Sequence, residues 1–421
     1  MIELGNLKLT NGAYVYIQIE DGLIKGVTTI AQTDSWIDCR GWTVVPAGID
    51  GHVHFRDQEE RHKEDWNTGS HAALLGGYTL VADMPNKKRP IITCERLVEL
   101  TEFIGQRAVD YRLWFGATND NLREMSHAIK HPKVLGVKVY RGSSTGSLLV
   151  EEDEPFWKIG ELVATANTKT KPVYVASHNE DEKLMRYKRA KLGREPQISD
   201  HCQIRDTEVE LSSVLKTIQM QRDTGCPVYY CHISTPESLH ALYSAKQEGL
   251  SIVVEVCAHH VSLSNRGNDP FGKVNPPLRS ESQMRRMAWL LNQPDFIDVI
   301  GSDHAPHTEG EKLAGGYDNT PSGLTGVQTT IPLLLDRISR GLLSWERFVA
   351  LTSGNYAALL GINRGKISAD REAELTLVDP QEQWIITNES IVSKCQWTPY
   401  NGTLVTGAVK AVFTRGSLKK F

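Results

Sequence analysis

Short apolar runs alternate with amphipathic segments through the middle of the chain. The runs begin near Val44, Tyr78, Tyr111, Val134, Pro172, Pro227, Ser251 and Phe296. The segments between them have apolar residues at helical spacing and include 66–75, 96–105, 122–129, 206–222, 236–247 and 281–291. Eight strands that alternate with helices are typical of a (β/α)8 TIM barrel, whose functional sites lie at the C-terminal ends of the strands. The pattern therefore predicts an α/β barrel.

The two ends of the chain follow another pattern. Residues 1–47 have short strand-like runs separated by Asn11-Gly12 and Asp21-Gly22, which are strong hairpin signals. After a last helical region at 345–360, strand-like runs return at 373–378, 383–386, 404–407 and 409–414. We expect residues 1–47 and 365–421 to pair into one small β-sandwich domain and residues 48–364 to form the barrel.

Metal-type side chains end several of the predicted strands. His52 and His54 follow the apolar run 44–49, and because strand side chains alternate, both imidazoles point to the same side. The other polar residues that end apolar runs are Lys138, His178, His232 and Asp303. The pair of histidines alone is weak evidence, but five strand ends with such residues predict a binuclear metal hydrolase.

Composition and charge limit the classes of partner. The chain has 421 residues, of which 40% are hydrophobic and 23% charged, and a net charge of −4. This balance favours neither nucleic acid nor an anionic membrane as a partner. The sequence has no long apolar run, and we expect neither a membrane span nor a leader. The seven scattered cysteines indicate reduced thiols and a cytoplasmic location. Cys231, next to His232, is predicted to point to the opposite face and to pack in the core.

Longer motifs then identify a family. They are His52-Val53-His54-Phe55-Arg56, Lys63-Glu64-Asp65, Met84-Pro85-Asn86, Gly136-Val137-Lys138, Ser177-His178-Asn179-Glu180-Asp181, Cys231-His232-Ile233-Ser234, Asn275-Pro276-Pro277-Leu278-Arg279 and Ser302-Asp303-His304-Ala305-Pro306-His307. With these motifs the chain resembles the amidohydrolase superfamily over nearly its whole length, and within it the longer bacterial dihydroorotases.

The resemblance implies two divalent metal ions, with zinc the natural choice for imidazole and carboxylate ligands. It implies that His52, His54 and Asp303 hold one ion and that His178 and His232 hold the other. Lys138 would be carboxylated by CO2 to a carbamate that bridges the ions. Asp303 would also be catalytic, because it would take a proton from the attacking water and deliver it to the leaving ring nitrogen.

The resemblance also implies contacts to a small-molecule substrate that carries a carboxylate. Arg56 lies two residues after His54 and suits bidentate carboxylate binding, although a structural salt bridge is the alternative for this residue. Asn86, Asn275 and His307 are the other expected substrate contacts. The chain departs from the family after Arg56, where Asp57-Gln58-Glu59-Glu60 stands in place of the usual Pro-Gly pair.

Three functions compete at this point. The leading one is the reversible interconversion of dihydroorotate and N-carbamoyl-L-aspartate in pyrimidine synthesis. An allantoinase or a dihydropyrimidinase of the hydantoinase type would share the metal centre but usually lacks the combination of Arg56 and Asn86. An inactive scaffold subunit would have lost metal ligands, and this chain keeps all six. The resemblance is also compatible with a homodimer.

Overall fold

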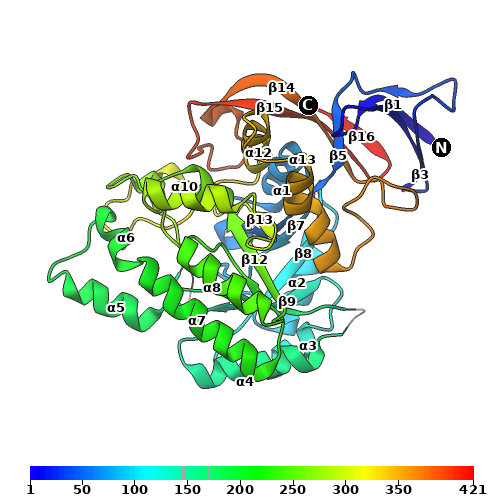
Figure 1. The fold of residues 1–421 in the computed structure, drawn as a ribbon. Helices are drawn as coiled ribbons and strands as arrows, with labels where there is room; N and C mark the ends of the chain where they lie inside the picture. The colour runs from blue at the N-terminus through cyan, green and yellow to red at the C-terminus, as the bar shows by residue number, and fades with distance from the viewer. Residues whose placement is uncertain (145, 147, 169–170) are drawn as a thin grey trace.

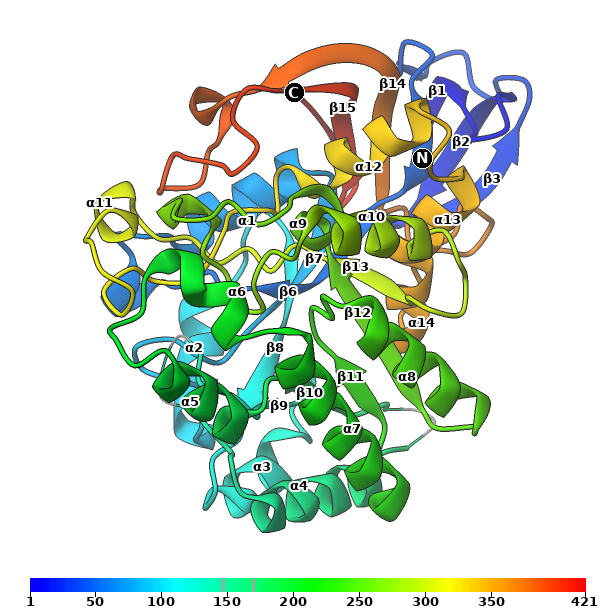
Figure 2. The same ribbon diagram turned by 60° about the vertical axis from the view of Figure 1, so that its left-hand side comes forward.

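The barrel is built from eight parallel strands in sequential order. The computed structural model describes residues 1–144, 146, 148–168 and 171–421. Each barrel strand pairs with the next along the chain, so the spatial order follows the sequence order from β6 to β13. Figures 1 and 2 show these strands surrounded by helices. Their bounds are β6 (Gly48–Val53), β7 (Tyr78–Asp83), β8 (Asp110–Gly116), β9 (Val134–Tyr140), β10 (Tyr174–His178), β11 (Val228–Tyr230), β12 (Ile252–Cys257) and β13 (Val299–Gly301).

The first and last strands approach each other beyond the end of β13. Val53 and His304 form a parallel bridge, and the N–H of His54 donates to the carbonyl of His304 at 2.8 Å. These contacts nearly close the barrel, and they bring residues from the two ends of the barrel sequence to the same rim. The predicted (β/α)8 barrel is confirmed.

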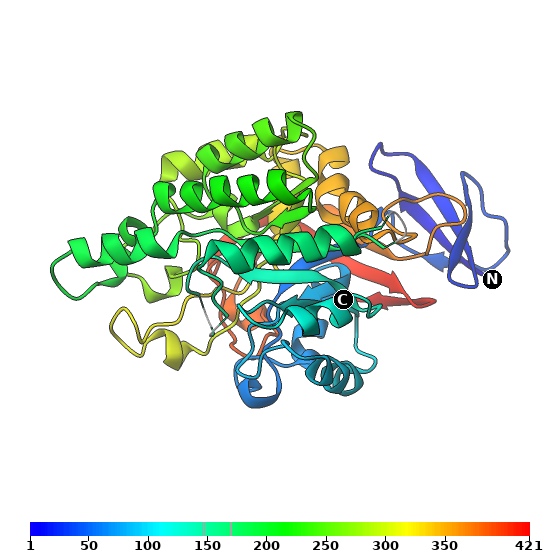
Figure 3. The same cartoon turned by 90° about the horizontal axis from the view of Figure 1, so that it is seen from below.

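Helices cover the outside of the barrel (Figures 2 and 3). Several begin at a side chain that caps the first backbone N–H groups, such as Asp65, Thr93, Asp206 and Thr235. The helices are α1 (Trp66–Leu75), α2 (Cys94–Ile104), α3 (Leu122–Ala128), α4 (Asp153–Ala166), α5 (Glu182–Lys191), α6 (His201–Ile204), α7 (Thr207–Thr224), α8 (Pro236–Gln247), α9 (Ala258–Ser262), α10 (Glu281–Leu290), α11 (Glu309–Lys312), α12 (Thr330–Ser339), α13 (Trp345–Val349) and α14 (Asn355–Leu360).

The predicted helical segments match α1, α2, α3, α7, α8 and α10 closely, whereas α4, α5 and α12 were not predicted. The region expected to be helical at 345–360 contains α13, a π-helical turn (Ala350–Gly354) and α14. None of the helices in the described part of the chain combines the length and apolarity needed to cross a membrane.

The two chain ends form one mixed sheet beside the barrel. Its order is β16-β15-β14-β5-β1-β2-β3, with β4 paired to β1, and its strands enclose a hydrophobic cluster separate from the barrel core. Figures 1 and 3 show the blue N-terminal and red C-terminal strands on the same side of the molecule. The division at residues 47/48 and 364/365 stays a prediction. The strands are β1 (Ile2–Lys8), β2 (Tyr14–Glu20), β3 (Leu23–Thr28), β4 (Ile37–Asp38), β5 (Thr43–Pro46), β14 (Leu375–Ile386), β15 (Thr403–Thr414) and β16 (Ser417–Lys420).

One predicted strand start is wrong. The apolar run from Val44 was expected to begin the first barrel strand, but β5 ends at Pro46 and pairs antiparallel with β14 of the terminal sheet. Proline has no N–H to donate, so a ladder commonly ends there. The barrel strand β6 starts at Gly48, where a Cβ would lie 2.7 Å from the ring of Tyr78.

The loop between β14 and β15 returns to the mouth of the barrel. The Ser393 hydroxyl donates to the carboxylate of Glu64, and Lys394 forms an ion pair with Asp65. Trp397 Nε1 donates to the carbonyl of His307 at 2.7 Å. This segment (Ser393–Trp397) therefore ties the terminal sheet to two loops of the barrel mouth.

The pairing of β9 with β10 sets how deep Lys138 lies in the barrel relative to His178, because Lys138 pairs with Ala176 in this register. Gly136 pairs with Tyr174, and a Cβ at Gly136 would lie 2.0 Å from the carbonyl oxygen of Tyr174. Because that neighbour is backbone, it cannot turn aside as a side chain would. The two strands can keep this register only with glycine at 136.

We therefore predict that Gly136→Ala destabilises the fold. Overpacking of a tight interior commonly costs about 1–3 kcal/mol, and the backbone clash puts this variant at or above that range. Denaturant unfolding of purified protein measures the change. Gly310→Ala is the matched control, because Gly310 is exposed in α11 with no heavy atom within 4 Å of the added methyl group. Equal midpoints for wild type and Gly136→Ala would contradict the prediction.

Candidate metal centre and active site

The predicted site residues meet at one pocket at the C-terminal ends of the barrel strands. All of them line it except His307, which contacts Arg56 in the pocket wall. The lining residues among those predicted are His52, His54, Arg56, Asn86, Lys138, His178, His232, Asn275 and Asp303. The convergence follows from the fold, because parallel barrel strands present their C-terminal ends on the same face.

Three of the predicted ligands form a compact group. Nε2 of His54 lies 3.0 Å from Oδ1 of Asp303, and Nε2 of His52 lies 3.3 Å from the same oxygen. One nitrogen or oxygen atom from each of the three lies within 4.8 Å of the others, and all three residues are buried. Two imidazoles and a carboxylate at such distances are suited to hold one divalent metal ion.

The second pair of histidines lies beside the first group. Nδ1 of His178 and Nε2 of His232 are 3.0 Å apart, and the rings of His52 and His232 are 5.2 Å apart between centroids. Burial lowers the pKa of both His178 and His232, and Lys138 lowers each further. Both imidazoles are therefore neutral at physiological pH, which is the form that binds metals.

Lys138 occupies an unusual position for a lysine. It is fully buried inside β9, and its Nζ donates to Sγ of Cys231 at 2.9 Å. Among the described residues no carboxylate lies within ion-pair distance of Nζ, although a buried unpaired ammonium costs free energy. Lys138 is thus a buried cation whose charge no described carboxylate offsets.

The orientation predicted for Cys231 is wrong. The sequence argument placed Cys231 and His232 on opposite faces of one strand, but β11 ends at Tyr230. His232 has a positive φ of 36°, so strand alternation stops at the turn, and both side chains reach the barrel interior. Cys231 therefore lies against Lys138 rather than in the outer core.

Sequence reasoning missed Glu255, the acidic residue inside β12. Its Oε1 accepts from Nδ1 of His52 and from the backbone N–H of His232, both at 2.8 Å. Its Oε2 accepts from the Tyr229 hydroxyl at 2.5 Å. Because Nδ1 of His52 donates to this carboxylate, its Nε2 is the nitrogen left to face Asp303 and a metal ion. A charged residue within the valine-rich run 252–257 was the signal that could have found it.

Glycine at position 301 makes room for that carboxylate. A Cβ on Gly301, the last residue of β13, would lie 2.5 Å from Oε2 of Glu255. Because Gly301 of β13 has no side chain, the carboxylate of Glu255 can occupy the space that a Cβ would take.

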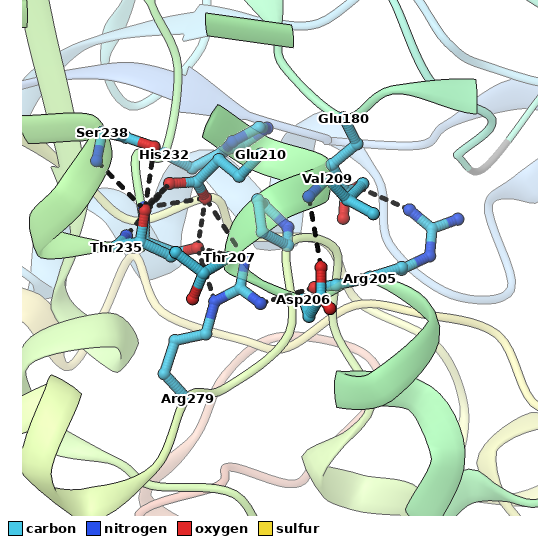
Figure 4. Close-up of polar contacts among 12 residues, drawn as sticks. Glu180, Arg205, Asp206, Thr207, Val209, Glu210, His232, Thr235, Ser238 and Arg279 are labelled. Atoms are coloured by element: carbon cyan, nitrogen blue, oxygen red, sulfur yellow. Dashed lines mark hydrogen bonds and ion pairs between the residues drawn. The ribbon is translucent and has the colours of Figure 1, made fainter. Parts of the chain in front are cut away.

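A second carboxylate supports His178. Oε2 of Glu180 lies 2.8 Å from Nε2 of His178. The same oxygen accepts from the guanidinium of Arg205, and Figure 4 shows Glu180 and Arg205 on its right side. Burial would raise the pKa of Glu180, but Arg205 and His178 bring it to about 2. The carboxylate is therefore ionised, and it leaves Nδ1 of His178 directed at His232.

The loop after His232 is held by Glu210 of α7. Glu210 accepts from the backbone N–H and hydroxyl groups of Ser234 and Thr235, and Arg279 pairs with the same carboxylate (Figure 4). Arg279 is the last residue of the motif Asn275-Pro276-Pro277-Leu278-Arg279. Its contacts here are with Ser234, Glu210 and the carbonyl of Arg205.

The charges around His52 and Asp303 favour a cation. Burial lowers the pKa of His52, but the carboxylates of Glu255 and Asp303 overcome this effect and raise it to about 10. Burial raises the pKa of Asp303, but His52 and His54 hold it well below its usual range. Buried carboxylates thus attract positive charge at this point, either as a proton on His52 or as a metal ion in its place.

Arg56 lies at the other side of the pocket. Its side chain is 1% exposed, its Nε donates to the carbonyl of Pro306, and its Nη2 donates to Nε2 of His307 at 3.2 Å. Burial lowers the pKa of His307 to about 3, so its ring is neutral and can accept from Arg56. No carboxylate of the described residues forms an ion pair with Arg56, and its Nη1 has no partner among them.

The departure from the family after Arg56 has a structural counterpart. Arg56, Asp57 and Gln58 all have positive φ, at 27°, 64° and 47°. Asp57 supports this loop because its carboxylate accepts from the N–H groups of Gln58 and Trp66. A Pro-Gly pair cannot make these contacts, so the loop is held by an aspartate instead.

Comparison with known proteins agrees with this geometry. The Amidohydrolase family model matches residues 43–419. A dihydroorotase of Methanosarcina mazei is 32% identical over 406 residues, which covers 93% of this chain and 85% of that protein. Dihydroorotases of Halobacterium salinarum and Pyrococcus furiosus are each 33% identical, covering 94% and 96% of this chain and 90% and 88% of theirs.

Solved structures share the fold at lower sequence identity. The L-hydantoinase (dihydropyrimidinase) of Arthrobacter aurescens superimposes with a TM-score of 0.92 at 24% identity, covering 99% of this chain and 95% of that one. The dihydropyrimidinase of Brevibacillus agri gives 0.88 at 22% identity, covering 99% and 94%. With a family match over nearly the whole chain, this protein is an enzyme of the amidohydrolase family.

Proposed function

We propose that this enzyme is a dihydroorotase, which interconverts dihydroorotate and N-carbamoyl-L-aspartate in pyrimidine synthesis. The observation that carries the proposal is the buried guanidinium of Arg56 without an ionic partner among the described residues. The names of the relatives that are more than 30% identical over most of the chain support the same activity. The substrate is then a small cyclic amide with a carboxylate.

The position of Arg56 favours a substrate carboxylate over a structural salt bridge. An arginine stays charged in a protein, so a buried guanidinium needs anionic or hydrogen-bonding partners. His307 and the carbonyl of Pro306 use only part of its donors. A carboxylate that arrives with the substrate would complete the set, with Asn86 and Asn275 in the same pocket.

The six proposed ligands suit two divalent ions. His52, His54 and Asp303 would hold one ion, His178 and His232 the other, and a carbamate on Lys138 would bridge them. Zinc suits this set of imidazole and carboxylate ligands. When bound, such ions supply a hydroxide at neutral pH and polarise the amide carbonyl of the substrate.

Asp303 is the proposed acid–base group. Its pKa is held below the usual range, so it is ionised and can accept a proton from the attacking water. It lies on the turn after β13 with a positive φ of 45°, which directs the carboxylate to the centre of the site. Delivery of the same proton to the leaving ring nitrogen completes the hydrolysis, and the reverse steps close the ring.

The alternatives differ from this proposal in the substrate. A hydantoinase or allantoinase would act on a ring without a carboxylate and would leave Arg56 without its partner. A scaffold without activity would have no need for the complete set of ligands. The homodimer and the cytoplasmic location stay expectations from the sequence.

We predict that Lys138→Ala loses most of its metal and nearly all of its activity, because the anionic bridge disappears. Elemental analysis and turnover of dihydroorotate measure both effects. A small carboxylic acid added to the variant is expected to restore a fraction of the activity by standing in for the carbamate. Lys158→Ala, at a half-exposed lysine, is the control. Metal content and turnover equal to wild type would show that Lys138 is not the bridge.

Asp303→Asn separates proton transfer from metal binding. The amide oxygen can still contact a metal ion but cannot carry a proton, so turnover should fall by about 10²–10⁴-fold. Steady-state rates, normalised to the measured metal content, test this expectation. A variant that kept more than a tenth of the wild-type rate would exclude Asp303 as the acid–base group.

Arg56→Met tests the substrate. Charge-assisted hydrogen bonds contribute roughly 1.5–3 kcal/mol and bidentate pairs somewhat more, so kcat/KM for dihydroorotate should fall by about 10²-fold or more. Metal content should not change, because Arg56 is not a proposed ligand. The control is Arg285→Met at an exposed site of α10.

Steady-state kinetics of the wild type, Arg56→Met and Arg285→Met on dihydroorotate, dihydrouracil and allantoin decide which substrate the enzyme prefers. A wild-type preference for either neutral ring would overturn the dihydroorotase proposal and leave a cyclic amidase of the hydantoinase type.

A further inference from the structure

Tyr140 has a hydroxyl group in the proposed active site, and the reaction proposed above gives this hydroxyl no role. Tyr140 is the last residue of β9 and follows Lys138 by two, so both side chains point into the barrel. The residue is 3% exposed and lines the same pocket as the proposed metal ligands. Its hydroxyl has no hydrogen-bond partner among the residues that the structure describes.

Besides Nδ1 of the proposed metal ligand His232, two more polar atoms of the same pocket lack a partner within the described chain. They are Nη1 of Arg56 and Oδ1 of Asn275. Buried polar atoms are normally paired, and a group of unpaired ones in a single pocket indicates a ligand with matching groups. Tyr140 and Arg56 supply donors and Asn275 an acceptor, so the ligand must present both kinds of group.

Tyr140 and Arg56 line the same pocket, and each has a buried polar atom without a partner in the described chain. The ring itself is packed over the lysine, with Nζ of Lys138 5.1 Å from its centroid, and its centroid is 5.8 Å from that of His178. The ring thus packs against Lys138 and His178, and its hydroxyl is left to bind a ligand in the pocket that Arg56 also lines.

We propose that the Tyr140 hydroxyl donates a hydrogen bond to the substrate carboxylate, together with Arg56, and so determines specificity for acidic rings. The inference rests on the proposed function, because it requires a substrate that carries a carboxylate. A carboxylate has about four lone-pair positions, and a bidentate arginine occupies two. The amide carbonyl has less need for the phenol, because the metal ions of this family already polarise that oxygen.

This role of Tyr140 predicts that loss of its hydroxyl weakens activity on dihydroorotate but not on rings without a carboxylate. Tyr140→Phe removes only the hydroxyl, so kcat/KM for dihydroorotate should fall by about 10- to 100-fold, mainly through KM. Turnover of dihydrouracil, which has no carboxylate, should stay within about twofold of the low wild-type value. Metal content should equal that of wild type. In an Arg56→Met background the further effect of Tyr140→Phe should be small, because the carboxylate is no longer held in place.

Tyr230→Phe is the matched control. Tyr230 is equally buried, but its hydroxyl donates to Gln221 of α7 on the outer side of the barrel wall. This variant removes a buried phenolic hydroxyl from β11, two strands away from β9, at a residue that does not line the pocket. Its kinetics on both substrates should match those of wild type.

Calorimetric binding of orotate and uracil separates the two proposals. If wild type binds orotate and Tyr140→Phe weakens orotate at least 10-fold but not uracil, the role of Tyr140 is supported. If both proteins bind orotate equally, or if the variant loses metal or loses both substrates equally, the role is overturned and the dihydroorotase proposal stands. If wild type neither binds orotate nor turns over dihydroorotate, the proposed function fails, and this role fails with it.

Discussion

Buried charge in the middle of the barrel is the constraint on which the site depends. Glu255 lies on the inner face of β12 and binds the His52 ring, the backbone of His232 and the Tyr229 hydroxyl together. A carboxylate at such depth is tolerated only when its oxygens are fully used. It therefore fixes side chains of β6 and β11 and the turn that follows β11, and it determines which nitrogen of His52 faces the centre.

Other buried carboxylates at the rim of the pocket support the site in the same way. Glu180 orients His178 with help from Arg205, and Glu210 holds the loop that follows His232 with help from Arg279. Each histidine ring or loop is thus positioned by an acid that is itself paired with an arginine or a hydroxyl. Such supporting carboxylates commonly fix ligand geometry at metal sites, because an unsupported imidazole can rotate. The cost of burying these acids is offset by the paired cations.

The sequence predicted the barrel, the terminal sheet and the residues that meet at the pocket, because these depend on periodicity and on where strands end. It did not predict the buried carboxylates that hold the histidine ligands and their loops. Glu255 and Glu210 act through contacts between residues 23 to 203 positions apart, and no local pattern encodes such pairs. Cys231 was placed on the wrong face for a related reason. The turn at His232, with its positive φ, depends on the hydrogen bond from its N–H to Glu255, so tertiary contacts decided where alternation stopped.

The contact of Ser393–Trp397 with the barrel mouth means that the molecule is not two separable modules. This segment belongs to the C-terminal strands, yet it pairs with Glu64 and Asp65 and binds the backbone of His307. A truncation that removes the tail would therefore leave the first barrel loop and the His307 loop without these contacts. The barrel mouth is therefore built from both parts of the chain, and Ser393–Trp397 belongs to it structurally as much as the barrel loops do.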